Sequence, residues 1–203
     1  LPFGPAADTI ALVGIFALAR VFIALAGMDV GTAFGSMGAR REMLIGFLAE
    51  PALLMVFFTA SLISQSTSLS TIVETFARRE FTIYPSLAFA GVAFTMVSLA
   101  ENARVPVDNP TTHLELTMIP EAMILEYSGR HLAFIEWSAA LKLYVCSCLG
   151  LALFFPWGVP QGADFVNLPL ALVSLLFKLA IGGALLALIE TLSAKMRIFR
   201  APE

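Results

Sequence analysis

The chain has 203 residues, of which 59% are hydrophobic and only 13% are charged, and its mean hydropathy is +0.87. Because about 25% of the residues of a soluble domain are charged, this composition excludes an ordinary soluble protein and predicts a polytopic membrane protein. The net charge of −3 is small and the charges alternate in sign along the loops, which argues against a nucleic-acid-binding surface.

Five segments are apolar for long enough to cross a bilayer, which takes about 20 residues of helix. They run approximately over residues 8–28, 42–63, 83–100, 132–155 and 165–189. The connections are too short for a separate soluble domain, so we expect one all-α transmembrane bundle over residues 1–203. Leu1 opens without an initiator Met or a signal-peptide pattern, and we expect that the natural start is missing.

The basic residues predict the orientation of these spans. With five crossings, one side collects Arg40, Arg41, Arg104, Arg130, Lys195, Arg197 and Arg200. The opposite side receives Arg78 and Arg79, which Glu74 and Glu80 offset. Because short loops rich in Lys and Arg stay in the cytoplasm, we expect a cytoplasmic C-terminus.

The connection over residues 101–131 is unusually acidic for a membrane protein. It carries Glu101, Asp108, Glu115, Glu121 and Glu126. Unpaired charges at the membrane are costly, so such a group marks a candidate functional site. For Glu121 and Glu126, the face of a solvated loop is an alternative interpretation.

Prolines predict that this connection forms a broken helix. Asn109 is a good N-cap with Pro110 at the first helical position, and Pro120 should interrupt the helix midway. Irregular backbone at membrane depth is tolerated only where protein or a water-filled cavity surrounds it. We therefore expect a partly re-entrant segment beside a polar cavity that opens to the cytoplasm.

Charged residues also lie inside the predicted spans. Glu50, Lys142 and Lys178 are well inside, whereas Glu136 and Arg20 lie nearer the ends. Buried acids and amines are suited to take up and release protons near neutral pH. A structural role for Glu50 beside Pro51, and a buried ion pair or a subunit interface for the two lysines, are the alternatives.

No metal site is predicted from the sequence. His113 and His131 have no Cys or third His at ligand spacing. Cys146 and Cys148 are two positions apart in an apolar run, so they point to different faces of a helix.

Two regions of sequence resemble a known family. LAENARVPVDNP at 99–110, followed by Glu115 and by EYSG at 126–129, resembles the acidic loop of the family of respiratory complex I subunit 1. GSMGARRE at 35–42 with Glu50 resembles an earlier cytoplasmic loop and buried glutamate of that family. VPVDNP and HLELTMI are closer to its hydrogenase branch, which includes formate hydrogenlyase subunit 4, hydrogenase-4 component C and related membrane-bound nickel-iron hydrogenases. The family normally has further spans before residue 1.

The resemblance implies a non-catalytic membrane subunit of an oxidoreductase complex in the bacterial or archaeal cytoplasmic membrane. It would anchor the large and the small, iron-sulfur subunits of a hydrogenase through residues 29–41 and 101–131, beside antiporter-like membrane subunits. The chain would bind no cofactor itself, and the iron-sulfur and nickel-iron centres would lie in partner subunits.

The resemblance also implies site residues. Those implied for proton translocation and its coupling are Glu50, Glu101, Asp108, Glu115, Glu121, Glu126, Glu136, Lys142 and Lys178, with Arg41 and Arg104 as charge partners. Two alternatives stay open. One is a quinone-binding subunit 1 of a proton-pumping NADH:quinone oxidoreductase, and the other is a stand-alone secondary transporter with carboxylates near the midplane.

Overall fold

The computed structural model describes residues 8–78, 85–104, 119–158 and 168–192. These residues form α1 (Thr9–Asp29), α2 (Ala33–Ser64), α3 (Leu69–Arg78), α4 (Pro85–Glu101), α5 (Pro120–Ile124), α6 (Gly129–Phe154) and α7 (Leu168–Leu192). Four helices, α1, α2, α6 and α7, are long and apolar enough to cross a membrane, and α4 is a shorter apolar helix. The prediction of an all-α membrane bundle is confirmed.

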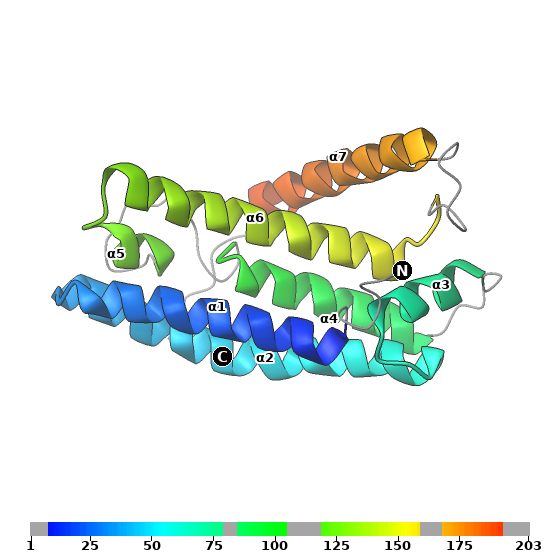
Figure 1. Cartoon of the computed structure of the whole chain (residues 1–203), viewed down its shortest axis with the longest axis horizontal. Helices are drawn as coiled ribbons and strands as arrows, with labels where there is room; N and C mark the ends of the chain where they lie inside the picture. The colour runs from blue at the N-terminus through cyan, green and yellow to red at the C-terminus, as the bar shows by residue number, and fades with distance from the viewer. Residues whose placement is uncertain (1–7, 79–84, 105–118, 159–167, 193–203) are drawn as a thin grey trace.

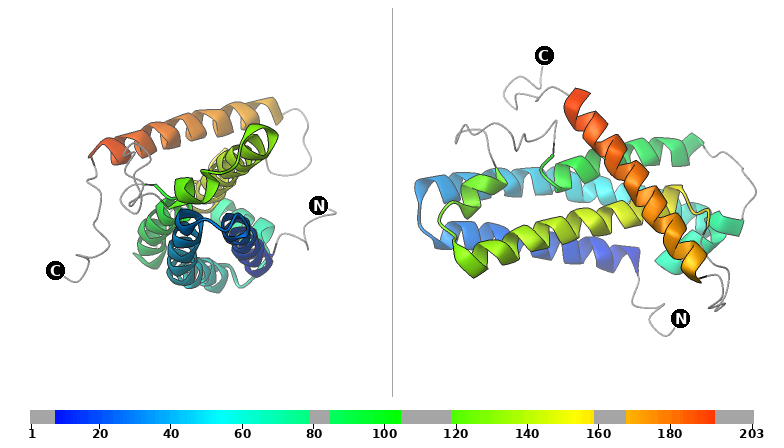
Figure 2. Two further views of the ribbon diagram at one scale, coloured as in Figure 1. Left: turned by 90° about the vertical axis from the view of Figure 1, so that its left-hand side faces the viewer. Right: turned by 90° about the horizontal axis from the view of Figure 1, so that it is seen from above.

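The helices run roughly along one long axis (Figure 1). α1 and α2 form an antiparallel hairpin, α4 packs on α2, and α6 packs on α4. α7 lies on the outside of α6 and crosses the bundle obliquely (Figure 2). α4 and α7 stop part-way along the bundle, whereas α1, α2 and α6 continue to the end where α5 lies (Figure 1). The C-terminal end of α4 is therefore inside the bundle and not at its tip.

Side-chain caps and a tight turn set the limits of the α1–α2 hairpin. The Asp8 carboxylate accepts a hydrogen bond from the amide of Ile10 at 2.9 Å, and the Thr32 hydroxyl accepts one from the amide of Gly35 at 3.2 Å. Such caps satisfy amides that the first helical turn leaves without partners. Gly31 has a φ of 73°, which glycine adopts readily, and this lets α2 turn back along α1.

Apolar side chains from several helices form the core on the α3 side of the bundle. Val13, Leu53, Phe57, Phe94 and Leu153 belong to one buried cluster contributed by α1, α2, α4 and α6. The outer faces are apolar too, with Phe47, Met55, Phe89 and Phe177 between 66% and 78% exposed. In a membrane protein such faces contact lipid. Lipid tails are apolar, so no hydrophobic effect drives these side chains into the protein interior.

Tryptophans indicate how α6 crosses the membrane. Trp137 and Trp157 are 67% and 66% exposed, and exposed Trp residues favour the two membrane interfaces. From Trp137 to the end of α6 at Phe154 the helix rises about 26 Å, close to the ~30 Å of a hydrocarbon core. Lys142, five positions beyond Trp137, then lies about 7 Å inside that core.

Some segments differ from the sequence-based predictions. α2 begins at Ala33, so most of the expected loop at 29–41 is helical, and α3 was not expected. Pro120 does not interrupt a helix in the described residues, because it occupies the first position of α5, where a missing amide costs nothing. The helix expected from Asn109 onward lies outside the described residues.

Candidate functional site

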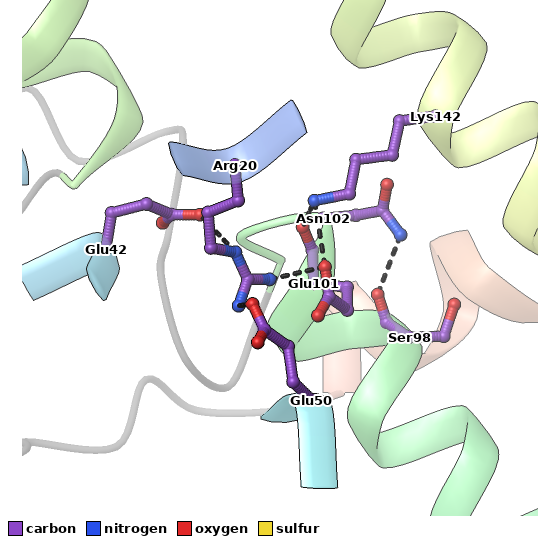
Figure 3. Close-up of polar contacts among 7 residues, drawn as sticks. All are labelled: Arg20, Glu42, Glu50, Ser98, Glu101, Asn102 and Lys142. Carbon is purple, nitrogen blue, oxygen red and sulfur yellow. Dashed lines mark hydrogen bonds and ion pairs between the residues drawn. The ribbon is translucent and has the colours of Figure 1, made fainter. Parts of the chain in front are cut away.

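Arg20 of α1 is the centre of a group of charged side chains inside the bundle (Figure 3). Its side chain is 2% exposed, and its Nε lies 3.2 Å from Glu42 Oε1 on α2. Its Nη1 lies 3.7 Å from Glu50 Oε1, and its Nη2 contacts Glu101 Oε2 on α4. An arginine is costly inside an apolar span, so these carboxylates are what permits its burial.

Lys142 of α6 adds a second cation to this group. Its Nζ lies 2.9 Å from Glu101 Oε2 and donates a hydrogen bond to the backbone carbonyl of Glu101 at 2.8 Å. The Glu101 side chain is 3% exposed, so both of its charge partners act in a poorly solvated setting. We call Arg20, Glu42, Glu50, Glu101 and Lys142 the Arg20 cluster.

A glycine makes room for the Arg20 side chain on α2. A Cβ at Gly46 would lie 2.7 Å from Arg20 Cδ, closer than two carbons approach without bonding. Glu42, Gly46 and Glu50 follow one another at intervals of four residues, so they lie on successive turns. Arg20 lies across Gly46 and can therefore reach the carboxylate on either side of it.

The contacts of Arg20 are close approaches of charge and not aligned hydrogen bonds. The three guanidinium nitrogens and Glu101 Oε2 are shielded from solvent, and none has a hydrogen-bond partner with good geometry. Charge attraction in a poorly solvated setting is strong even without alignment. The arrangement therefore holds the ions together mainly by their opposite charges.

The end of α4 directs two side chains in different directions. The amide of Arg104 donates to the carbonyl of Leu99 at 2.9 Å, and the amide of Ala103 donates to that of Ala100 at 3.2 Å. With Ala103 at a φ of 48°, this is a Schellman helix end, a place usually taken by glycine. Glu101 joins the Arg20 cluster, whereas Arg104 Nη1 lies 3.1 Å from Glu190 Oε1 on α7.

α5 covers the α1–α2 hairpin beyond the Arg20 cluster. A Cβ at Gly27 would lie 2.9 Å from Met123 Cγ, and one at Gly38 would lie 2.9 Å from the carbonyl oxygen of Ile119. The Tyr127 hydroxyl donates to the carbonyl of Ala26 at 3.0 Å. Glycines on both helices thus admit α5 closely, and an apolar layer of Ala24, Ala39 and Met123 separates the cluster from that end.

Comparison with known proteins identifies the family. A family model described as NADH dehydrogenase matches residues 1–203. The chain belongs to this family, which is that of complex I subunit 1. The resemblance seen in the acidic segment and in GSMGARRE is thereby confirmed.

Two relatives from Escherichia coli strain K12 carry more specific names. The chain is 32% identical to "Formate hydrogenlyase subunit 4" over 201 residues, which are 99% of this chain and 64% of that protein. It is 34% identical to "Hydrogenase-4 component C" over 199 residues, which are 97% of this chain and 61% of that protein. The chain thus spans less than two thirds of the length of either relative.

Three of the residues predicted for the site of this family member come together in the structure. Glu50, Glu101 and Lys142 all belong to the Arg20 cluster. Arg104 pairs with Glu190 instead, and Arg41 is half-buried beside Glu42 and makes an interaction of its own.

The other predicted residues lie elsewhere. Glu121 is half-buried on α5, and Glu126 and Glu136 are exposed. Lys178 of α7 donates to the carbonyl of Phe155 at 2.8 Å, also contacts that of Trp157, and lies 5.4 Å from the centre of the Trp157 ring. It therefore contacts the start of the α6–α7 connection and makes no ion pair with the Arg20 cluster among the described residues. Asp108 and Glu115 lie outside the described residues.

Sequence reasoning missed Arg20, Glu42 and Glu190 as site residues. Arg20 was interpreted as a residue near a span end, and Glu42 as the start of a span. The available signal was the isolation of Arg20, since it and Asp29 are the charged residues of α1. A single arginine in an apolar helix requires buried acids from other helices, although the sequence does not say which ones.

The chemistry open to the Arg20 cluster is charge exchange and proton transfer. Arg20 stays protonated in proteins, so it is a fixed positive charge, whereas carboxylates and the Lys142 amine can gain or lose a proton. Among the described residues, no three His, Cys, Asp or Glu side chains are grouped as metal ligands.

Proposed function

We propose that this chain is a membrane subunit of a complex I-like hydrogenase or formate hydrogenlyase complex, in which it couples electron transfer in soluble partner subunits to proton translocation. The proposal includes a location in the bacterial or archaeal cytoplasmic membrane with the C-terminus in the cytoplasm. The names of the two relatives support the type of complex, and both describe one part of a larger assembly. The chain itself would carry no redox centre, and iron-sulfur and nickel-iron centres would belong to its partners.

The observation that carries the coupling role is the burial of Arg20 among acids from two other helices. Its guanidinium is 2% exposed and meets Glu42, Glu50 and Glu101. Two unit charges 4 Å apart interact by about 4 kcal/mol at an effective dielectric constant of 20. Movement of one carboxylate away from Arg20 would therefore remove a large part of the charge attraction that holds the cluster together.

The proposed mechanism combines the fixed positive charge of Arg20 with the carboxylate of Glu101, which can gain or lose a proton. In the structure, the Glu101 carboxylate lies against the cations of Arg20 and Lys142. In this proposal, a displacement of the end of α4 separates Glu101 from Arg20 while Lys142 stays attached to the Glu101 backbone carbonyl, and Glu101 takes up a proton. Return of α4 would release the proton, and one proton crosses the cluster in each cycle when it is taken up from the cytoplasmic side and released toward the antiporter-like subunits.

The acidic segment is the candidate link to the partner subunits. In sequence it follows Glu101, includes Asp108 and Glu115, and precedes α5, which carries Glu121. A hydrogenase large subunit and its iron-sulfur small subunit would dock over this segment, where a change in their charge would act on nearby carboxylates. Antiporter-like subunits would receive the proton further along the membrane, and Glu136 stays a candidate for that path.

The test compares the same substitution at two intramembrane lysines. In membranes that contain the complete complex, Lys142→Gln should lower the number of protons moved per hydrogen molecule turned over. Lys178→Gln should leave this ratio unchanged, because Lys178 contacts backbone carbonyls at the α6–α7 connection. Equal ratios for wild type and Lys142→Gln, at normal hydrogen turnover, would refute the coupling role.

The family description favours one second candidate, a quinone-binding subunit of an NADH:quinone oxidoreductase. The two candidates share the fold and differ in their partners and in the need for quinone. Purification of the native complex through this chain distinguishes them. Nickel-iron and iron-sulfur subunits with hydrogen turnover independent of quinone favour the hydrogenase, whereas bound quinone and inhibition by quinone analogues favour the oxidoreductase.

A further inference from the structure

An ion pair joins the end of α4 to the C-terminal part of α7. Arg104 Nη1 lies 3.1 Å from Glu190 Oε1 and donates a hydrogen bond to it. The two side chains are 33% and 25% exposed, so the pair is partly shielded by protein. Nothing in the proposed coupling mechanism uses Glu190.

The rest of α7 packs loosely on the described part of the bundle. No residue in its most apolar stretch is buried, and a Cβ at Gly182 or Gly183 would meet nothing within 4 Å. The ion pair of Glu190 with Arg104 therefore contributes strongly to the position of the C-terminal part of α7. Loss of this ion pair would let that part of α7 move.

The backbone connects Arg104 directly to the Arg20 cluster. The amide of Arg104 closes the Schellman end of α4, and Glu101 lies in the last turn of the same helix. Arg104 and Glu101 are three residues apart on one hydrogen-bonded helix end, so a movement of this backbone carries both residues. The contact of Arg104 with α7 is therefore also a restraint on Glu101.

We propose that Glu190 is a positioning residue for Glu101, acting through Arg104 and the end of α4. This inference rests on the proposed coupling function and adds α7 to it. While the ion pair is intact, Glu101 is held against Arg20 and Lys142. When α7 moves away, the end of α4 is released and the Glu101 contacts loosen.

The test uses charge substitutions in the complete complex and measures protons moved per hydrogen molecule turned over. Glu190→Gln and Arg104→Gln should each lower this ratio by about two- to fivefold, the effect expected for losing a partly exposed ion pair. The double variant should be no worse than either single one, and the exchange Arg104→Glu with Glu190→Arg should recover most of the ratio. Glu74→Gln is the matched control, because Glu74 pairs with Arg78 on the exposed surface of α3.

A second comparison separates this inference from the coupling function itself. In a Glu101→Gln background, Glu190→Gln should have no further effect on the ratio. Additive losses, or an exchanged pair that assembles but recovers nothing, would overturn the role of Glu190 while leaving an effect of Glu101→Gln intact. A wild-type ratio in Glu101→Gln alone would overturn the coupling function, and with it the inference.

Discussion

Lys142 holds Glu101 at two points, with its Nζ 2.9 Å from the carboxylate and 2.8 Å from the backbone carbonyl of the same residue. The contact to the carbonyl does not depend on the charge of the carboxylate. Lys142 therefore remains attached to the end of α4 when Glu101 gains a proton. Lys142 can therefore stay in contact with Glu101 in either charge state of the carboxylate. The contact between Glu101 and Arg20 depends on charge alone.

Removal of Arg20 should destabilise the protein strongly. Arg20→Ala leaves buried acids without their common partner, and breaking a buried ion pair by removing one side costs about 3–5 kcal/mol. We expect little assembled complex in the membrane and a lower midpoint of thermal unfolding. Arg78→Ala, at an exposed pair, should change neither quantity measurably.

The same experiment has an internal check. Arg20→Gln combined with Glu101→Gln should recover part of the lost stability, because it removes the unpaired charge together with its partner. Equal midpoints for Arg20→Ala and wild type would show that the buried pairs do not stabilise the fold.

A single methyl group on α2 should disturb the cluster. Gly46→Ala puts a Cβ 2.7 Å from Arg20 Cδ, so Arg20 must move, and we expect a loss of about 1–3 kcal/mol in the free energy of unfolding. Gly14→Ala is the control, since its Cβ would meet nothing within 4 Å and alanine favours a helix over glycine. Thermal unfolding of the two variants measures the difference, and a neutral Gly46→Ala would contradict the packing described for Arg20.

The end of α4 should tolerate glycine better than its natural alanine. Ala103 adopts a φ of 48°, which costs an L residue about 1–2 kcal/mol relative to glycine. Ala103→Gly should therefore raise the midpoint of thermal unfolding, and Ala103→Val should lower it because a β-branched residue fits this conformation worst. The reverse order would mean that the Schellman end is not formed in the complex.

The sequence predicted the spans because burial in lipid demands long apolar runs, and length alone reveals them. It did not predict the start of α2, since GSMGARRE has the glycines and charges of a loop. The glycines serve close packing instead. Gly35 lies against the carbonyl of Gly27 on α1, and Gly38 lies against α5, and these contacts exist only in the folded bundle.

The sequence predicted only part of the site, because the partners of each charge are set by the folded bundle. Glu50, Glu101 and Lys142 stood out as charges within or beside spans, but the sequence could not separate Lys142 from Lys178, which lies in the same kind of apolar context. The folded structure separates them. Lys142 pairs with the buried carboxylate of Glu101, whereas Lys178 contacts two backbone carbonyls at the α6–α7 connection. Arg20 was missed because its partners lie 22, 30 and 81 positions away in the chain.

Glu101→Gln tests whether Glu101 exchanges a proton during turnover, on which the proposed coupling depends. Glutamine keeps the size of the side chain and cannot ionise, and Glu126→Gln is the control at an exposed acid of the same segment. In sealed membrane vesicles with the complete complex, we expect Glu101→Gln to retain hydrogen turnover and to lose proton translocation, with Glu126→Gln close to wild type. Full proton translocation by assembled Glu101→Gln would contradict a proton-carrying role for Glu101.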